Sequence, residues 1–172
     1  MSGLTVRVAH QDITTVETDA LVVGFFEDIR PLKDLAGRLD WLLCGALSRL
    51  LIEKRIQGRL GDVALLTPRG KVPAGKIFLI GCGPRSVFSL AALQSVAKSA
   101  ATCVAGAGVS RAAVEYMHAE GIIGADGLAS IRAGLIEGIQ GRDLTVTLLV
   151  QDNDLYGRLV RGSAAPRESL GF

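Results

Sequence analysis

A chain of 172 residues with 49% hydrophobic and 21% charged residues has the length and composition of one globular domain, which excludes a disordered polypeptide. The formal net charge of +2 is too small to indicate binding to nucleic acid or to an acidic membrane by itself. Three widely spaced cysteines without a C-x-x-C pair favour buried, inert thiols in a reducing compartment over a disulfide framework.

The first apolar run contains Arg7 and is followed by His10, so it does not resemble a signal peptide. No apolar run has the length that a bilayer span requires. We therefore expect a cytoplasmic protein that makes no membrane contact.

The predicted elements begin with strands on either side of a polar turn. Residues 4–9 alternate apolar and polar side chains, which is typical of a half-buried edge strand. Residues 20–26 form a continuous apolar run, which is typical of a strand covered on both faces. Leucines at helical spacing then predict one helix over residues 35–53.

Strands and helices continue to alternate along the rest of the chain. We predict short buried strands at 63–67 and 76–81, a helix at 89–105 that stops at Gly106 and Gly108, a strand at 111–117, a helix capped by Asp126, a strand at 143–150 and a short helix at 152–160. The alternation predicts an α/β fold of three layers, with a mixed, mostly parallel sheet between helices. We expect a single domain over residues 1–161 and a disordered tail over 162–172.

Two glycine-rich loops follow predicted strands, where ligands of such sheets usually bind. One contains Gly81, Cys82 and Gly83, and the other runs from Gly121 through Ile122 and Ile123 to Gly124. Backbone N–H groups of such a loop can bind a phosphate beside a helix N-terminus. Glycines also serve tight turns, which is the commoner reason for such spacing, so both interpretations stay open. Cys82 is the cysteine that such a loop is most able to expose.

Several segments resemble macro domains, in the same order along the chain. The segments are QDITTVETDALVV from residue 11, GDVALLTPRGKVPAGKIFLIGCGPR from residue 61, GIIGADGLASIRAGLIEGI from residue 121 and VTLLVQDNDLYGRLV from residue 146. The resemblance implies a macro-domain-like fold in which Asp12 would accept a hydrogen bond from an adenine amine. The candidate ligand-binding residues are therefore Asp12, Ile13, Gly81, Cys82, Gly83, Gly121, Ile122, Ile123 and Gly124.

A closer resemblance runs from TDALVVGFFED at residue 18 to GAGV at residues 106–109. Together with LDWLLCGALSRLL and AGKIFLIGCGPRSVFSLAALQSVAKSAA, these segments resemble the N-terminal domain of leucyl aminopeptidases, which is itself macro-like. In that family the domain is non-catalytic, helps to build a hexamer and precedes a catalytic domain that carries two metal ions. The segment HAEGIIGAD superficially resembles the aminopeptidase metal motif, but His118 and Ile122 replace its first Asp and its Arg. We expect no metal site, no cofactor, no catalytic residues and no catalytic domain.

The sequence departs from macro domains at the loops that hold ADP-ribose. Val23-Gly24-Phe25-Phe26 stands where those domains have an Asn-Ala-Ala-Asn loop for the distal ribose. Residues 40–46, which include Trp41, stand in place of their first glycine-rich phosphate loop. Bulky side chains in both places make ADP-ribosyl hydrolysis an unexpected activity.

Two functions of different class follow. The first is a non-catalytic macro-like module that acts through protein contacts or assembly, as a homo-oligomer. The second is a binder of ADP-ribose or another nucleotide-like molecule. Trp41 and Phe25–Phe26 discriminate between them, because core positions favour the first function and an open cleft favours the second. Nucleic-acid binding through Arg158, Arg161 and Arg167 is disfavoured, since a charge run is commonly a solvated face.

Gly134 and Gly138 lie four residues apart in the third predicted helix. Glycine inside a helix costs about 1 kcal/mol relative to alanine, so two of them predict a close approach. The sheet is the favoured neighbour, and another chain is the alternative.

Overall fold

In the computed structural model, residues 3–117, 122 and 124–162 are described. Within them the chain forms one sheet of six strands in the order β1-β6-β5-β2-β4-β3. The strands are β1 Leu4–Ala9, β2 Thr18–Phe25, β3 Val63–Leu66, β4 Ala74–Gly81, β5 Arg111–Glu115 and β6 Leu144–Leu149. All neighbours are parallel except β3, which pairs antiparallel with β4. The predicted mixed, mostly parallel sheet is confirmed.

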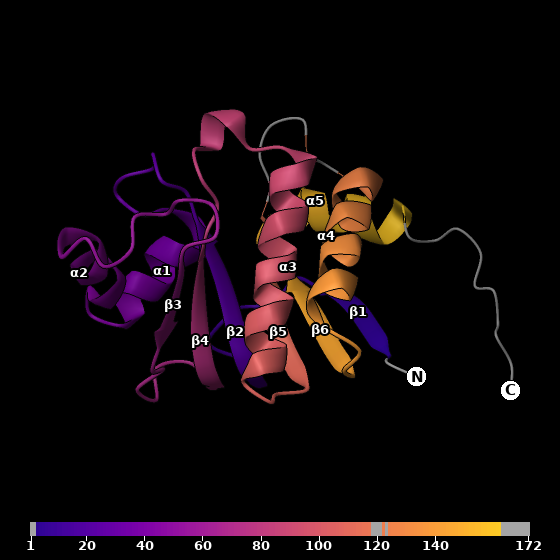
Figure 1. Ribbon diagram of the computed structural model, residues 1–172, viewed down its shortest axis with the longest axis horizontal. Coiled ribbons are helices and arrows are strands. Elements are labelled where there is room, and N and C mark those ends of the chain that lie inside the picture. The colour runs from indigo at the N-terminus through magenta and orange to yellow at the C-terminus, as the bar shows by residue number, and fades with distance from the viewer. Residues whose placement is uncertain (1–2, 118–121, 123, 163–172) are drawn as a thin grey trace, which may run out of the picture.

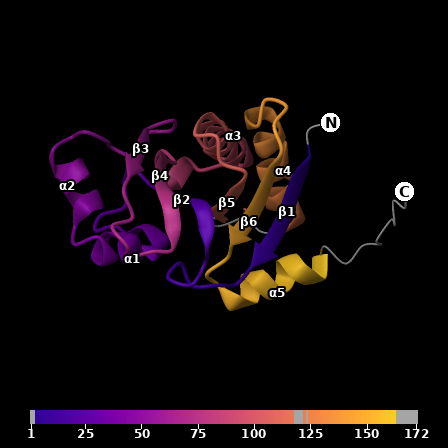
Figure 2. The ribbon, with the colours of Figure 1, turned by 90° about the horizontal axis from the view of Figure 1, so that it is seen from below.

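Helices cover both faces of this sheet and make the three predicted layers (Figures 1 and 2). The helices are α1 Asp34–Leu42, α2 Ala46–Ile52, α3 Leu90–Gly106, α4 Ala125–Gly138 and α5 Asn153–Gly162, with a short 3-10 helix η1 at Arg85–Val87. Helices α3 and α4 lie side by side on one face, while α1 and α5 lie on the other (Figure 2). No helix among the described residues is long and apolar enough to cross a membrane.

Strand β2 shows why its continuous apolar run is a strand between two layers. Ala20 and Val22 face the hydrophobic cluster beneath α3 and α4, whereas Leu21 and Val23 face the cluster beneath α1 and α2. All four side chains are buried, because successive residues of a strand point to opposite faces of the sheet. The core is therefore divided into two clusters by the sheet.

The predicted helix over residues 35–53 is wrong in its continuity, because two helices occupy that segment. Cys44 and Gly45 have left-handed φ values of 53° and 78°, which end α1 and reorient the chain. The Asp40 carboxylate then accepts hydrogen bonds of 2.9 and 3.0 Å from the N–H groups of Leu47 and Ser48 and so caps α2. The helical spacing of apolar residues continues across the break, so a prediction based on periodicity alone treats the two helices as one.

The prediction that residues 63–67 form a buried strand is wrong, because β3 lies at the edge of the sheet and its Val63 and Leu65 side chains are exposed. Smaller differences occur at element ends. Strand β5 ends at Glu115 and not at Met117. Helix α4 has Gly124 as its N-cap, and Asp126 lies in the first turn, so the predicted Asp126 cap is wrong. Gly134 and Gly138 face α3 and not the sheet, so the favoured neighbour of these glycines was also wrong. The predicted tail lies outside the described residues, apart from Gly162.

The three cysteines differ in environment. Cys82 is buried, Cys103 is half-buried and Cys44 is exposed, so the prediction of buried thiols is wrong for Cys44. Burial raises the pKa values of the Cys82 and Cys103 thiols, which keeps both protonated at neutral pH. The loop around Cys82 therefore does not expose it.

Candidate functional site

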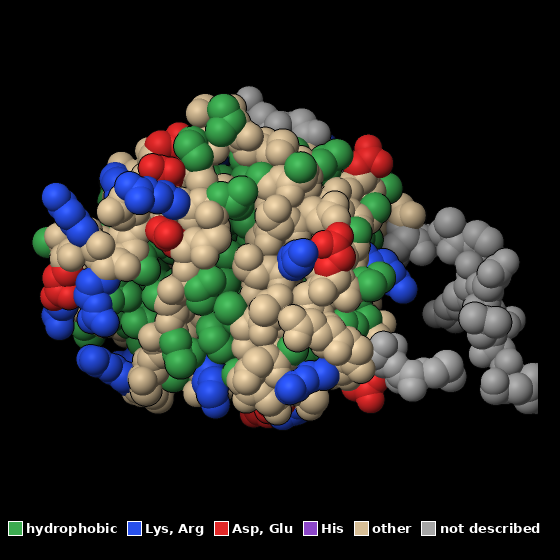
Figure 3. Space-filling view, in the orientation of Figure 1, with side chains coloured by type: hydrophobic (Ala, Val, Ile, Leu, Met, Phe, Trp, Pro, Cys, Tyr) green, Lys and Arg blue, Asp and Glu red, His purple; other side chains and the backbone are tan. Residues whose placement is uncertain are grey.

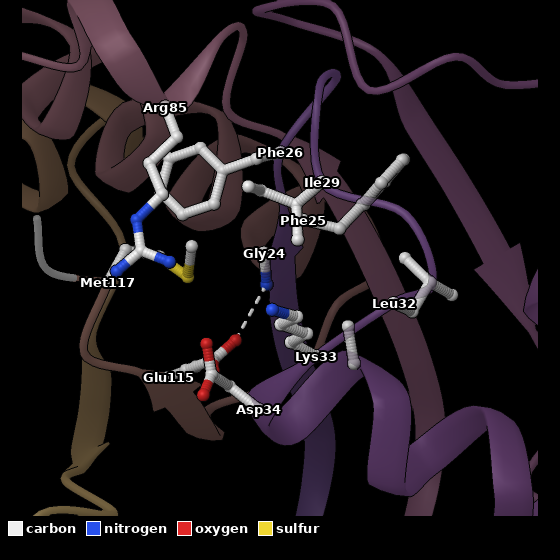
Figure 4. A pocket seen from close by; sticks show the side chains of 11 residues that line it. Gly24, Phe25, Phe26, Ile29, Leu32, Lys33, Asp34, Arg85, Glu115 and Met117 are labelled. Atoms are coloured by element: carbon white, nitrogen blue, oxygen red, sulfur yellow. Dashed lines mark hydrogen bonds between the residues drawn. The ribbon is translucent and has the colours of Figure 1, made fainter.

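The side chain of Glu115 lies where the neighbouring strands β2 and β5 end, at the edge of the sheet formed by the C-terminal ends of its parallel strands. The Glu115 carboxylate accepts a 3.0 Å hydrogen bond from the N–H of Gly24 (Figure 4). It also accepts a backbone hydrogen bond from Leu35, and Asp34 at the start of α1 faces it. Three segments that are distant in sequence therefore converge on one side chain.

The side chains of Met117 and Cys82 pack closely against Gly24 and would have to shift to admit a side chain there. A Cβ at Gly24 would come within 2.5 Å of the Met117 sulfur and 2.9 Å of the Cys82 sulfur. The glycine at the second position of the Val23–Phe26 segment thus permits tight packing, and its N–H donates to Glu115.

Glu115 has an unusual titration. Burial raises the pKa of Glu115 to about 8, and the negative charge of Asp34 acts in the same direction. The hydrogen bonds from Gly24 and Leu35 oppose this shift in pKa but are outweighed. Glu115 is therefore protonated at neutral pH, which is a property of acid–base groups and also of buried structural carboxyls.

The space around Glu115 is small. A cavity of about 20 Å³ lies between Glu115 and residues that include Phe25 and Arg85, which is room for roughly one water. A second cavity, of about 280 Å³, lies between Glu115, Tyr116 and Gln151. Small-molecule sites usually have volumes of about 300–1,000 Å³. The site around Glu115 falls below that range.

Trp41, Phe25 and Phe26, whose positions were expected to distinguish a protein-contact module from a small-molecule binder, differ in their burial. Phe25 and Phe26 are 4% and 8% exposed and pack into the core, although Phe26 also lines both cavities. Arg85 lies over the Phe26 ring, with its guanidinium carbon 5.7 Å from the ring centroid. Trp41 is 79% exposed and therefore belongs to neither the core nor these cavities. The two phenylalanines favour the non-catalytic module.

In the first glycine-rich loop, residues 81–83, the backbone N–H groups donate hydrogen bonds to other parts of the same chain. The N–H groups of Gly81, Cys82 and Gly83 donate to the carbonyl oxygens of Asp62, Phe25 and Gly58, over 2.8 to 2.9 Å. A Cβ at Gly81 would collide with the backbone of Gly58 and Arg59, so the glycine serves a close crossing of two chain segments. None of these three N–H groups is available to a phosphate.

The predicted adenine site at Asp12 and Ile13 is also engaged internally. Asp12 accepts a 2.8 Å hydrogen bond from the N–H of Thr14 and forms an ion pair with Arg38 of α1. Hydrogen bonds from Thr14 and the charge of Arg38 hold the pKa of Asp12 below its usual value. The Ile13 side chain is 1% exposed and packs into the core beneath α1.

The second glycine-rich loop is only partly described. Gly121, Ile123 and His118 lie outside the described residues, and Ile122 is buried in the core beneath α3 and α4. Gly124 has φ 87° and ψ −142°, a conformation that is essentially restricted to glycine. Neither of the two cavities at Glu115 is lined by Asp12, Gly81 or Gly124, so those cavities do not bring the predicted residues together.

Sequence reasoning missed Glu115 and Asp34. The detectable signal was a carboxylate directly after the apolar residues Ala112–Val114, at the carboxyl end of a predicted strand. Over residues 3–117, 122 and 124–162 there is no group of three or more His, Cys, Asp or Glu residues arranged to hold a metal ion.

Comparison with known proteins decides the relationship. Residues 22–140 match the N-terminal domain of the cytosol aminopeptidase family. The chain belongs to the cytosol aminopeptidase family. A probable cytosol aminopeptidase from Geobacter sulfurreducens is 38% identical over 120 residues, which cover 69% of this chain and 24% of that protein. The resemblance to this family, inferred from residues 18 to 109, is confirmed.

This cytosol aminopeptidase family member also resembles solved structures. A tomato leucine aminopeptidase mutant superposes with a TM-score of 0.70 at 19% identity, over 94% of this chain and 36% of that one. An Oceanobacillus iheyensis macrodomain with ADP superposes with a TM-score of 0.68 at 14% identity, over 91% of this chain and 88% of that one. These likenesses confirm the macro-like fold. The chain spans about a quarter or less of the length of the curated relatives that it matches.

Proposed function

We propose that this domain acts non-catalytically, through contacts with protein surfaces, and that it assembles with a second copy of itself. The supporting observation is the uncovered apolar face of the edge strand β3. Val63 and Leu65 are 43% and 59% exposed, whereas Ala64 and Leu66 on the opposite face pack against the cluster beneath α1 and α2. Exposed apolar side chains that gather on one edge usually mark an interaction site.

Layer geometry explains why this face is open. Helix α3 packs against β4 and β2, and α4 packs against α3 and β1. Neither helix extends over β3, so hydrophobic side chains form a strip over β3 and β4 beside α3 (Figure 3). Leu60, just before β3, adds a further exposed side chain.

A second copy is the partner that this edge fits. Strand β3 pairs with β4 on one side, so its other side presents unpaired backbone donors and acceptors. Antiparallel pairing of two β3 strands across a two-fold axis would continue the sheet between protomers. Val63 and Leu65 of both copies would then lie on one continuous face, where cross-strand apolar pairs stabilise pairing.

We expect light scattering to give a mass above the 18.1 kDa of one chain at micromolar concentration. Leu65→Lys should shift the protein to the monomer, because it places a charge within the apolar strip. Val87→Lys is the matched control, since Val87 is 70% exposed but lies on η1, away from β3. A monomer mass that persists to about 100 micromolar would contradict the proposal.

A second candidate function is binding of the phosphate of ADP-ribose or another nucleotide at the first turn of α4. One observation favours it. The Tyr116 hydroxyl is buried and has no hydrogen-bond partner within the described part of the chain. It lies against Gly127 in the first turn of α4, where backbone N–H groups favour an anion. A buried hydroxyl without a partner is uncommon, and a bound polar group would supply the missing partner.

If ADP-ribose binds there, Gly124→Val should abolish binding, because valine cannot adopt the backbone conformation of Gly124. Asp12→Ala should weaken binding by about 1 to 3 kcal/mol if Asp12 contacts the base. Isothermal titration measures both effects. Gly108→Val is the control, since Gly108 also has a positive φ and open surroundings but follows α3. Unchanged affinity in both site variants would place the ligand elsewhere.

A further inference from the structure

A further cavity lies at the opposite edge of the sheet from β3. It has a volume of about 540 Å³ and lies where the edge strand β1 runs between α4 and α5. Viewed from below, α4 lies on one side of β1 and α5 on the other (Figure 2). The cavity is therefore a groove with a strand as its floor and a helix as each wall.

Within the described residues, the floor of this groove presents unpaired backbone groups. The carbonyl oxygens of Gly3 and Ala9 accept hydrogen bonds from the N–H groups of Leu144, the first residue of β6, and Val150, which directly follows β6. In a parallel pair, alternate residues direct both backbone polar groups to the same neighbour. Odd-numbered residues of β1 thus face β6, and the N–H and C=O groups of Val6 and Val8 face the groove. An added strand would pair with these groups.

The walls combine apolar surface with positive charge. Val6, Val8, Leu128 and Leu159 supply apolar surface. Three arginines, Arg7 from β1, Arg132 from α4 and Arg158 from α5, also line the groove, and among the described residues that line it none is acidic. The ion pairs recorded within the described ranges include none of these three arginines.

We propose that this groove binds an extended acidic peptide segment of a partner protein as an additional strand beside β1. The backbone of Val6 and Val8 supplies the strand pairing, the apolar walls take alternate side chains, and the three arginines select carboxylates. The site is independent of the self-assembly proposed for β3, because β1 and β3 are the two opposite edges of the sheet.

Charge decides between a partner peptide and the chain's own residues 163–172, which directly follow Gly162 at the groove. That segment, SAAPRESLGF, contains one arginine and one glutamate, and its proline lacks an N–H. The charges of its side chains cancel, so its side chains offer no net negative charge to three arginines. An acidic peptide in trans is the better complement.

The test uses a fluorescently labelled, capped hexapeptide of alternating valine and glutamate, added to the full chain. We expect saturable binding, with changes in the amide resonances of Val6 and Val8. Replacing Arg7, Arg132 and Arg158 together with glutamine should weaken binding by at least about tenfold, as expected for lost charge-assisted hydrogen bonds. A variant with Arg49, Lys54 and Lys71 replaced by glutamine removes equal charge elsewhere and should bind normally.

Peptide controls keep the test independent of variant folding. The same peptide with alternate backbone N-methyl groups retains its charge but cannot pair as a strand, so it should bind at least about tenfold more weakly. Equal binding of the N-methylated peptide, or equal competition by a single-stranded oligonucleotide of the same charge, would overturn the proposal. Binding that appears only after removal of residues 163–172 would identify that segment as the occupant and would also overturn it.

Discussion

Replacing Gly134 and Gly138 with alanine is expected to destabilise the protein, although alanine is the better helix former. A Cβ at Gly134 would lie 2.9 Å from the Ala97 Cβ, and one at Gly138 would lie 2.6 Å from the Ala101 Cβ. Both would lie still closer to backbone carbonyl oxygens of α3, which cannot rotate away. Helices α3 and α4 would have to separate.

The sign of the change in stability follows from comparing the gain in helix propensity with the cost of overpacking. Alanine in place of glycine gains about 1 kcal/mol per site in helix propensity. Overpacking typically costs about 1 to 3 kcal/mol per site and more when backbone must move. The upper end of that range applies because the close contacts are with the backbone of α3, so urea unfolding should show a net loss of roughly 4 kcal/mol for the double variant.

Gly106→Ala is the matched control for this experiment. Gly106 is the last residue of α3 and has no atom within 4 Å of its would-be Cβ. This variant should be neutral or more stable than the parent. A double variant at Gly134 and Gly138 as stable as the parent would show that α3 and α4 are not in close contact in solution.

Glu115→Gln is expected to change the pH dependence of stability. The pKa of Glu115 is raised from 4.5 to about 8 in the folded protein, first by burial and then by Asp34. The stability that protonated Glu115 contributes is therefore fully present below pH 4.5 and is lost as the pH rises to about 8. Glutamine remains neutral, and its carbonyl oxygen can still accept the hydrogen bond from Gly24.

The advantage of the glutamine variant over the parent should therefore grow with pH. At 1.36 kcal/mol for each unit of pKa, the growth between pH 4.5 and pH 9 is on the order of 4 kcal/mol. Urea unfolding at several pH values measures it. Glu137→Gln is the control, because hydrogen bonds from Gln94 and Lys98 lower the pKa of Glu137 and reverse the sign. A difference that stays constant with pH would contradict a buried, protonated Glu115.

Sequence patterns were sufficient for most of the fold because they are local. The continuous apolar run at residues 20–26 predicts a strand covered on both faces and residues 76–81 predict a short buried strand, and both lie in the interior of the sheet. The break at Cys44 and Gly45 escaped prediction because apolar spacing continues through it. The ending of α1 depends on a left-handed turn and on the carboxylate of Asp40, which periodicity does not report.

The candidate site was less predictable because its chemistry depends on where backbone groups find partners. The sequence by itself determined that this is a macro-like α/β domain of the leucyl aminopeptidase type, since the alternation of strands and helices and the family motifs can be identified along the chain. Only the tertiary structure decided three features of the site and its surroundings. The backbone N–H groups of Gly81–Gly83 donate hydrogen bonds to neighbouring segments, and Gly134 and Gly138 allow α3 to pack closely against α4. The carboxyl group of Glu115 lies near the charge of Asp34. Each depends on residues brought together from distant parts of the chain, so no local pattern specifies them.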